Sequence, residues 1–574
     1  MTSNAKTILD GILELERKQT ASTLSDSDFF QIFTAEQILK NYGLSYEEIE
    51  SGIVDAQGGD GGIDAFYTFV NGVLVTEEAT FEQIRQNVLL HAIIIQSKTS
   101  TGFGEDAILK LESTTKDLLD ISHDPADFDK VYNPRLIRAV SLFHNTFKTL
   151  LGKLPEIHLT YHYATKADEV HPNVQRKVES LRATVARLFT PSKFTFHFNT
   201  AGGLLELARK SRIETLPLAV SETIQTQKGT VCLVTLKDYF GFIHDPDTGD
   251  LRGWLFEENV RDYEGKNIDV NKGIRKTLAE PKQTEDFWWL NNGITIVASK
   301  APMAGKALAL TDPKIVNGLQ TSMEIFNNFR GQLQFNDSRR ILVRVIDTDD
   351  ERTRNDIIKA TNSQSAIRPA SLRAFDEIQY RIEQFFAAND LFYDRRKNFY
   401  KNLKKPKDQI ISVTYLAQAV AAIMLQRPND SRGRPTNLIK NDSTYNQVFN
   451  DRHPIRVFLE CVLFMKAIDS FLLSQEAPAY VRGHEINVRF QVATFASAIL
   501  SRHLKPSAKF VESKGLSAIT NDGFARSVDE VWGLLQKRKD EIGVDEDRVA
   551  KSPDFDSLLK GRIRQINDSK QWPF

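Results

Sequence analysis

Hydrophobic residues in the first part of the chain recur at spacings that alternate between the period of a helix and that of a strand. Asn71-Gly72 stands between two alternating runs, which is typical of a tight hairpin turn. The pattern predicts helices at 26–42, 107–119, 134–151, 170–189 and 201–210, a helical insert at 80–90, and strands at 63–70, 73–76, 91–96, 156–164 and 193–199. This order predicts a mixed α/β domain over residues 1–212.

A different pattern begins near residue 229 and changes again near residue 405. The middle of the chain predicts an α+β region over residues 213–405, and the remainder predicts a mainly helical region over residues 406–574. The expected strands are 231–236 and 340–346, with a short strand and helix within 314–330, and the expected helices are 350–361, 371–386, 411–426, 454–473, 489–503 and 525–541. We expect the tail from residue 545 to be docked or partly mobile.

Length and composition set limits on the class of protein. A chain of 574 residues is too long for one ordinary core, and 41% hydrophobic with 26% charged residues is typical of soluble globular proteins. No apolar run is long enough for a membrane span, and the first residues lack the apolar core of a signal peptide. The two cysteines, Cys232 and Cys461, exclude a disulfide framework and a cysteine-rich zinc site. We therefore expect a cytoplasmic protein that makes no contact with a membrane.

Charge is balanced over the whole chain but not locally. The net charge of −1 gives no overall attraction to nucleic acid. The stretch from Arg395 to Lys407 holds seven basic residues and no acidic one, interleaved with aromatic residues. Its cations could bind phosphates while its aromatic rings stack on bases, or the stretch could be a solvated helix face with apolar anchors.

The most informative stretch lies at a glycine-rich turn and at the end of an apolar strand. The turn Gly59-Asp60-Gly61-Gly62 delivers Asp64 at the start of one strand, and the strand from His91 ends in Gln96-Ser97-Lys98. Strand alternation puts Gln96 and Lys98 on the same face. Asp64 and the Gln96 amide oxygen suit a hard cation such as Mg²⁺ or Mn²⁺, and Lys98 could stabilise charge on a phosphodiester. The glycines would let the backbone approach a substrate closely.

This set of residues resembles the PD-(D/E)XK nuclease superfamily, in the Mrr-like branch where glutamine replaces the second acid. The resemblance implies a restriction-endonuclease-like mixed sheet, DNA as the substrate, and Asp64, Gln96 and Lys98 as catalytic residues. It also implies an acidic metal ligand on the preceding helix, for which Glu36 is our candidate, with Glu47 and Glu48 as alternatives. Taken alone, a glycine-rich turn is usually only a turn, and a lysine at a strand end is usually solvated.

A second singular region lies in the middle of the chain. It reads Phe287-Trp288-Trp289-Leu290-Asn291-Asn292-Gly293, followed by Ile315-Val316-Asn317-Gly318-Leu319-Gln320 and by Asn362-Ser363-Gln364. Asparagine and glutamine at a helix start can bind an anion or read a base edge, or can satisfy buried backbone groups.

These motifs resemble the AIPR family, whose name stands for abortive infection phage resistance. The resemblance implies a role in bacterial defence against phage. The element around Asn317 is also similar to one in ParB-like proteins, which suggests a nucleotide as a ligand. Our candidate residues for binding nucleic acid or a nucleotide are Arg261, Asn292, Asn317, Gln320, Asn362, Arg395, Arg396 and Lys397.

Two functions follow from these observations. The first is a metal-dependent DNA endonuclease, acting on phage or host DNA in abortive infection. The second is a nucleotide- or nucleic-acid-binding sensor that regulates a partner defence protein and whose nuclease-like domain is weak or silent. A homodimer would allow cuts in both strands, and the sequence leaves the oligomeric state open.

Overall fold

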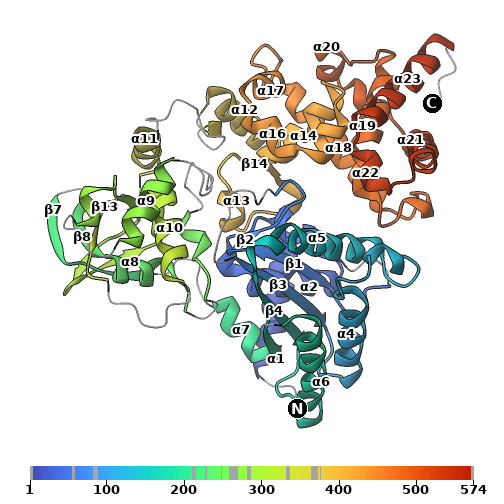
Figure 1. The fold of residues 1–574 in the computed structure, drawn as a ribbon. Helices are drawn as coiled ribbons and strands as arrows, with labels where there is room; N and C mark the ends of the chain where they lie inside the picture. The colour runs from blue at the N-terminus through green and yellow to red at the C-terminus, as the bar shows by residue number, and fades with distance from the viewer. Residues whose placement is uncertain are drawn as a thin grey trace. The chain divides into compact units, whose positions relative to one another are not determined.

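The structure is a computed structural model that divides into two compact units, residues 1–372 and 373–574 (Figure 1). It describes residues 4–54, 58–79, 81, 88–190, 192–209, 215–226, 229–246, 249–256, 269–280, 286–330, 337–348, 350–362, 373–374 and 376–569. The first unit contains an N-terminal α/β domain and a central α+β region, whose apolar residues form separate cores. The second unit is mainly helical. The expected mixed α/β chain with a helical C-terminal region is confirmed.

A five-stranded mixed sheet forms the centre of the N-terminal domain. Its order is β2-β1-β3-β4-β5, with β1 antiparallel to β3, and with β3, β4 and β5 parallel to one another. The strands are β1 Ala65–Val70, β2 Val73–Leu74, β3 Leu89–Lys98, β4 Glu156–Thr165 and β5 Ser192–Asn199. Asn71 and Gly72 both have positive φ, as the predicted hairpin turn requires. Of the predicted insert at 80–90, residues 80 and 82–87 lie outside the described residues, and 89–90 belong to β3.

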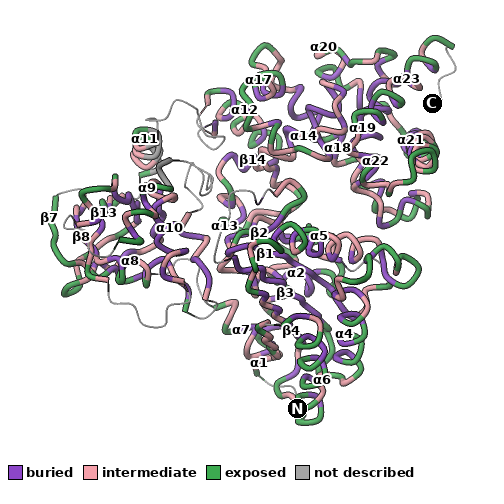
Figure 2. Tube along the Cα trace, viewed as in Figure 1, coloured by how far each residue is buried: buried purple, intermediate pink, exposed green. Residues whose placement is uncertain are grey.

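Helices cover both faces of this sheet, and strand alternation explains which residues meet them. Even-numbered residues of β3, such as Ala92 and Ile94, share a core with α4, α5 and α6. Odd-numbered residues, such as Ile93 and Ile95, share a core with α2. The helices are α1 Asn4–Thr20, α2 Asp26–Ile38, α3 Tyr46–Ser51, α4 Glu105–Leu118, α5 Pro134–Leu150, α6 Pro172–Leu188 and α7 Ala201–Arg209. In Figure 2 the central strands are buried along most of their length.

The central region is built on a second five-stranded sheet, in the order β12-β9-β13-β8-β7. Helices α8 and α10 share an apolar core with one face of it. A separate three-stranded sheet has the order β10-β11-β6. The strands are β6 Thr215–Ala219, β7 Glu222–Thr226, β8 Gly229–Thr235, β9 Ile294–Ala298, β10 Met303–Ala304, β11 Ala307–Thr311, β12 Lys314–Asn317 and β13 Arg340–Asp347, and the helices are α8 Leu236–Ile243, α9 Asp269–Ala279, α10 Leu319–Phe329 and α11 Glu351–Asn362.

The second unit begins at Arg373, earlier than the predicted boundary after residue 405. The reason is that β14 (Phe392–Asp394) pairs with β15 (Ile410–Ser412) across that boundary, while α12 (Glu377–Ala387) joins the helical core. The larger helices are α14 Val413–Ile423, α18 Arg456–Leu473, α19 Glu485–Ser501, α21 Asn521–Ile542 and α23 Pro553–Ser569. The last of these packs into the core through Phe555, Leu559 and Ile563, so the described part of the tail is docked.

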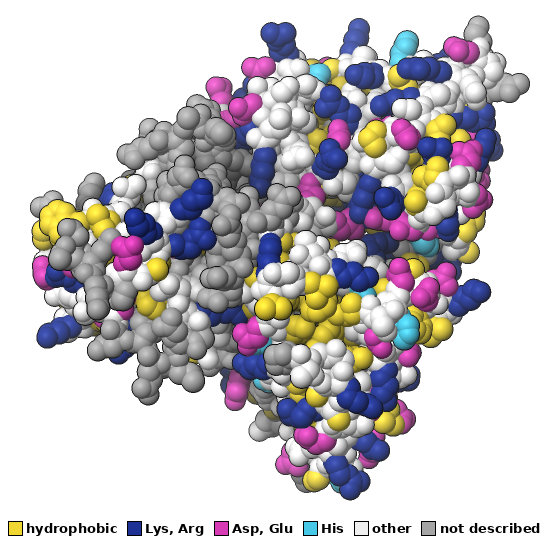
Figure 3. All heavy atoms as spheres, viewed as in Figure 1, with side chains coloured by type: hydrophobic (Ala, Val, Ile, Leu, Met, Phe, Trp, Pro, Cys, Tyr) yellow, Lys and Arg dark blue, Asp and Glu magenta, His cyan; other side chains and the backbone are white. Residues whose placement is uncertain are grey.

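Within the described ranges, no helix is both long and apolar enough to cross a membrane. On the face shown in Figure 3, the described Lys and Arg side chains are interspersed with Asp and Glu, in keeping with the balanced net charge.

Histidines gather on the α2 side of the N-terminal sheet. His91 pairs with His158, and His162 pairs with His197, whose ring it stacks against at a centroid distance of 4.8 Å. Burial, followed by the neighbouring His197, lowers the pKa of His162 to about 3. The folded protein therefore holds this imidazole neutral, with Nδ1 placed 3.0 Å from the Asn199 amide oxygen.

This depressed pKa predicts a pH dependence of stability. The unfolded chain protonates His162 below about pH 6.5, whereas the folded chain does not, so stability falls as the pH drops from about 6.5 toward 3. We expect a His162 contribution of about 1 kcal/mol per pH unit in this window. Urea unfolding between pH 4 and 7 should show a shallower pH slope for His162→Gln than for wild type. His123→Gln, which replaces an exposed histidine, is the control. Equal slopes in all three proteins would show that His162 does not cause the pH dependence of stability.

Candidate active site

Asp64 lies where β1 begins, against the end of β3. The turn before it is closed by a hydrogen bond from the Ile63 N–H to the Asp60 carbonyl (2.8 Å), and the Gly62 N–H donates to the Asp60 carboxylate (2.8 Å). The Asp64 side chain is 7% exposed. Its Oδ2 accepts hydrogen bonds from the Ser97 N–H (2.6 Å) and the Ser97 hydroxyl (3.1 Å). The carboxylate is therefore fixed at the peptide group that follows Gln96.

At two positions of the turn, the backbone conformation and the neighbouring helix α4 favour glycine. Gly61 and Gly62 have positive φ, and a Cβ on Gly61 would lie 2.3 Å from the Thr114 hydroxyl of α4. The same hydroxyl donates to the Gly61 carbonyl (2.7 Å). A Cβ on Gly62 would lie 3.1 Å from Cβ of Lys110 on α4. We expected the turn glycines to let the backbone approach a substrate closely. At Gly61 and Gly62 the backbone instead approaches α4 closely.

Gln96 is buried and carries an unsatisfied acceptor. It continues the even-numbered face of β3 and is 1% exposed. Its Oε1 has no hydrogen-bond partner among the described residues, although it is shielded from solvent. An unmet buried amide oxygen is costly, and oxygen ligands of this kind are the ones that Mg²⁺ prefers. The orphaned oxygen and the Asp64 carboxylate, which is held by the next residue along β3, are both ligands of the kind that a divalent cation accepts.

Lys98 is the last residue of β3 and is exposed. The strand emerges from the core at this residue. The ammonium group forms no ion pair or side-chain hydrogen bond with any residue in the described part of the chain. Its charge is consequently available to a phosphate at the end of the strand.

Tyr163 is a neighbour of this site that sequence reasoning missed. It pairs with Gln96 in the register of β3 and β4, and its hydroxyl accepts a hydrogen bond from the Gly104 N–H (3.1 Å), just before α4. Burial raises the pKa of Tyr163, and the negative charge of Asp64 raises it further. The Asp64 charge therefore acts on the side of the sheet where Gln96 lies. Only the register of the parallel strands reveals this neighbour.

The helix that carries Glu36, the predicted acidic ligand, covers the opposite face of the sheet from Gln96. Glu36 stands on α2, which packs against Ile93 and Ile95, whereas Gln96 belongs to the opposite face of β3. The alternative Glu48 accepts a hydrogen bond from the Ser45 N–H in a capping box at the start of α3. In the described ranges, no group of three or more His, Cys, Asp or Glu side chains could hold a metal. Glu36 as a ligand stays a prediction, and water would complete the coordination of a cation held by Asp64 and Gln96.

Two central candidates, Asn317 and Gln320, lie where β12 leads into α10. The Asn317 amide donates to the Thr361 carbonyl (2.5 Å), next to Asn362 at the end of α11. Gly318, the residue just before α10, has φ +104, and a Cβ there would lie 2.4 Å from the Ile294 side chain. Gln320 follows in the first turn. Asn317 thus satisfies a backbone group, which is one of the roles we considered.

Other central candidates are less well placed or lie outside the described residues. Asn292 is exposed, and its carbonyl accepts a hydrogen bond from Arg344 (2.8 Å). Arg261 and the side chain of Asn362 lie outside the described residues.

Among the basic candidates of the second unit, Arg395 is engaged internally. Its Nε donates to Glu383 (2.6 Å), and its guanidinium lies 4.0 Å from the centre of the Tyr380 ring. The guanidinium of Arg396 lies over the Phe399 ring, and Lys397 is exposed. The role of these three residues in nucleic-acid binding stays a prediction.

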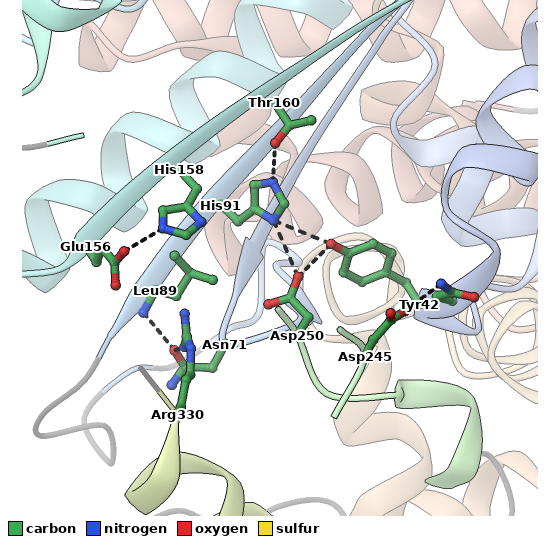
Figure 4. A network of polar contacts seen from close by, with 11 residues as sticks. Tyr42, Asn71, Leu89, His91, Glu156, His158, Thr160, Asp245, Asp250 and Arg330 are labelled. Carbon is green, nitrogen blue, oxygen red and sulfur yellow. Dashed lines mark hydrogen bonds and ion pairs between the residues drawn. The ribbon is translucent and has the colours of Figure 1, made fainter. Parts of the chain in front are cut away.

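A buried polar network joins the N-terminal domain to the central region (Figure 4). Asp250, 2% exposed, accepts a hydrogen bond from the Tyr42 hydroxyl (2.8 Å) and lies 3.6 Å from His91 Nδ1. Arg330, at the end of α10, donates to the Asn71 amide oxygen (3.0 Å). Burial opposes ionisation of Asp250, but contacts with His91 and Tyr42 outweigh it and leave its pKa below the usual value.

This network reaches the strand that carries the candidate site. His91 belongs to β3, the strand that ends in Gln96 and Lys98, and the N–H of Leu89 on the same strand donates to the Asn71 amide oxygen (2.8 Å). The central region is thus anchored at the opposite end of β3 from the Asp64 site.

A family model matches the central and C-terminal part of the chain. Residues 256–541, just under half of the chain, match the family model described as AIPR protein. This range contains the motifs from Phe287 to Asn362 and most of the helical unit, and it excludes the Asp64 site. No curated protein and no solved structure matches the chain.

Proposed function

We propose that this chain, which carries an AIPR region at residues 256–541, is a metal-dependent DNA endonuclease that acts in abortive-infection defence against phage. The defence role follows from the AIPR match. The nuclease role rests mainly on one observation: the buried Gln96 oxygen has no hydrogen-bond partner among the described residues, and the next residue of the strand, Ser97, anchors the Asp64 carboxylate.

Each residue at the end of β3 has a separate task in this proposal. Asp64 and Gln96 would hold Mg²⁺ or Mn²⁺, which when bound polarises a phosphate and lowers the pKa of a water. The Ser97 N–H and hydroxyl fix the orientation of the Asp64 carboxylate. The exposed Lys98 ammonium would stabilise the negative charge that develops on the phosphate during attack.

The test is cleavage of supercoiled plasmid with Mg²⁺, with Mn²⁺ and with a chelator. Wild type should nick or cut only with metal. Lys98→Ala should lower the rate about 100-fold or more, because one charge that stabilises the transition state is removed. Lys193→Ala, which removes an exposed lysine from β5 of the same sheet, is the matched control and should cleave at the wild-type rate. Full activity of Lys98→Ala would contradict the assigned role.

A second function is favoured by the convergence of Asn317, Gly318 and Gln320 at the start of α10, together with the neutral Gln96 in place of a second acid. In that case the central region binds a nucleotide or nucleic acid and regulates a partner defence protein. Absence of cleavage with either metal, combined with saturable nucleotide binding that Gln320→Ala weakens, would select this function.

A further inference from the structure

The run of three aromatic residues before β9 splits into an anchor and an exposed stack. Phe287 is buried in the central core, whereas Trp289 is 68% exposed and Leu290 is 46% exposed. The rings of Trp288 and Trp289 are stacked, with centroids 3.9 Å apart and an angle of 27° between their planes. An indole left this far in solvent forgoes the burial that most tryptophans gain, so it calls for an explanation.

The turn that presents these rings is held in place from both sides. The Trp289 N–H donates to the Asp286 carbonyl (3.1 Å), and the Asn291 amide donates to the Phe287 carbonyl (2.9 Å). The Asp286 carboxylate accepts from the backbone N–H and from Nε of Arg340, both at 2.7 Å, which ties the turn to β13. The exposed stack is therefore a fixed surface and not a loose side chain.

A positively charged side chain is hydrogen-bonded to the other end of the same turn. Arg344 is exposed on β13, two alternations beyond Arg340, and its Nη2 donates to the Asn292 carbonyl (2.8 Å). Arg340 is paired with Asp286 and Glu222. Arg344, by contrast, forms no ion pair with a carboxylate in the described ranges. One turn thus carries a stacked indole pair at its start and, at its end, a guanidinium that pairs with no carboxylate of the described residues.

We propose that Trp289 and Arg344 form a binding platform for single-stranded nucleic acid. A flat, exposed indole can stack on any base, and a guanidinium with no carboxylate partner can bind the adjoining phosphate. The bases of a duplex are stacked on one another and cannot reach the indole, so the occupant is a single strand. The inference rests on the proposed function only in taking nucleic acid as the occupant.

The test measures binding without cleavage, so that it does not depend on the nuclease site. Fluorescence anisotropy with full-length protein and a chelator would compare a labelled single-stranded oligothymidylate of about 20 nucleotides with a duplex of the same length. Wild type should prefer the single strand. Trp289→Ala should weaken single-strand binding about 10-fold or more, whereas Trp289→Phe should retain most of it. Arg344→Ala should weaken binding and reduce its salt dependence.

Leu154→Ala, which removes another strongly exposed apolar side chain, is the control and should bind as wild type does. Equal single-strand affinity in wild type and Trp289→Ala would overturn the proposal. So would a smaller oligomer for Trp289→Ala in light scattering with unchanged affinity, since the stack would then be a contact between copies of the chain. If cleavage is absent but Trp289-dependent binding is found, the nuclease proposal fails and the platform stands.

Discussion

Asp64→Asn should lower the rate of metal-dependent plasmid cleavage about 1,000-fold or more while leaving the protein folded. Asparagine keeps the size of the side chain and an oxygen that can accept from the Ser97 N–H, so the local structure should be preserved. It removes the negative charge that accepts the hydrogen bonds of Ser97, and with it an electrostatic attraction for a divalent cation.

The cleavage rates of wild type and Asp64→Asn should be compared at saturating and at limiting Mn²⁺. A defect in metal binding shrinks at saturating Mn²⁺, whereas a defect in the chemical step persists. Circular dichroism and the thermal midpoint of each variant should match those of wild type. Asp127→Asn, which neutralises an exposed acid in the same domain, is the control for net charge. Cleavage by Asp64→Asn at the wild-type rate would show that Asp64 is not part of the active site.

Asp250→Ala should destabilise the first unit by about 3 kcal/mol. The substitution leaves the buried Tyr42 hydroxyl and His91 without their shared acceptor, and breaking one partner of a buried polar network carries a penalty of this order. The effect should appear as a lower urea midpoint, with loss of the contact between the N-terminal and central cores.

A double-mutant cycle isolates the contact itself. Tyr42→Phe and Asp250→Asn remove the hydroxyl and the charge with little change in volume, and we expect a coupling energy of about 1–2 kcal/mol between them. Strictly additive effects would show that the two groups do not interact. Glu222→Ala, at an exposed ion pair with Arg340, should change stability by less than about 1 kcal/mol and serves as the reference for an ordinary surface contact.

Local sequence patterns were sufficient to predict most of the helices and strands of the N-terminal domain. Alternation along β3 correctly separated Ile95, which faces α2, from Gln96, which faces the other side, and the Asn71-Gly72 turn was found from two residues. These features depend on neighbours within one strand or one turn. The same reasoning missed α1, whose buried residues are Leu9, Leu13 and Thr20.

Features that depend on distant residues could not be read from the sequence. Tyr42 meets Asp250 from 208 positions away, and nothing near either residue marks the pair. Pairing of β14 with β15 moved the boundary of the helical unit from 405 to 372, since a three-residue strand has too little pattern to be recognised. The role of Asn317 as a donor to Thr361 likewise needed the fold, because asparagine near a helix start suits both backbone satisfaction and ligand binding.

The central claim is that a divalent cation is held at the end of β3. The most direct measurement is a crystal soaked in Mn²⁺, with the anomalous signal collected for wild type and for Asp64→Asn. The account predicts one strong peak in wild type, roughly 2.1–2.3 Å from an Asp64 oxygen and from Gln96 Oε1, and no peak there in the variant. A wild-type crystal whose protein cleaves DNA with Mn²⁺ but shows its manganese elsewhere would contradict the account.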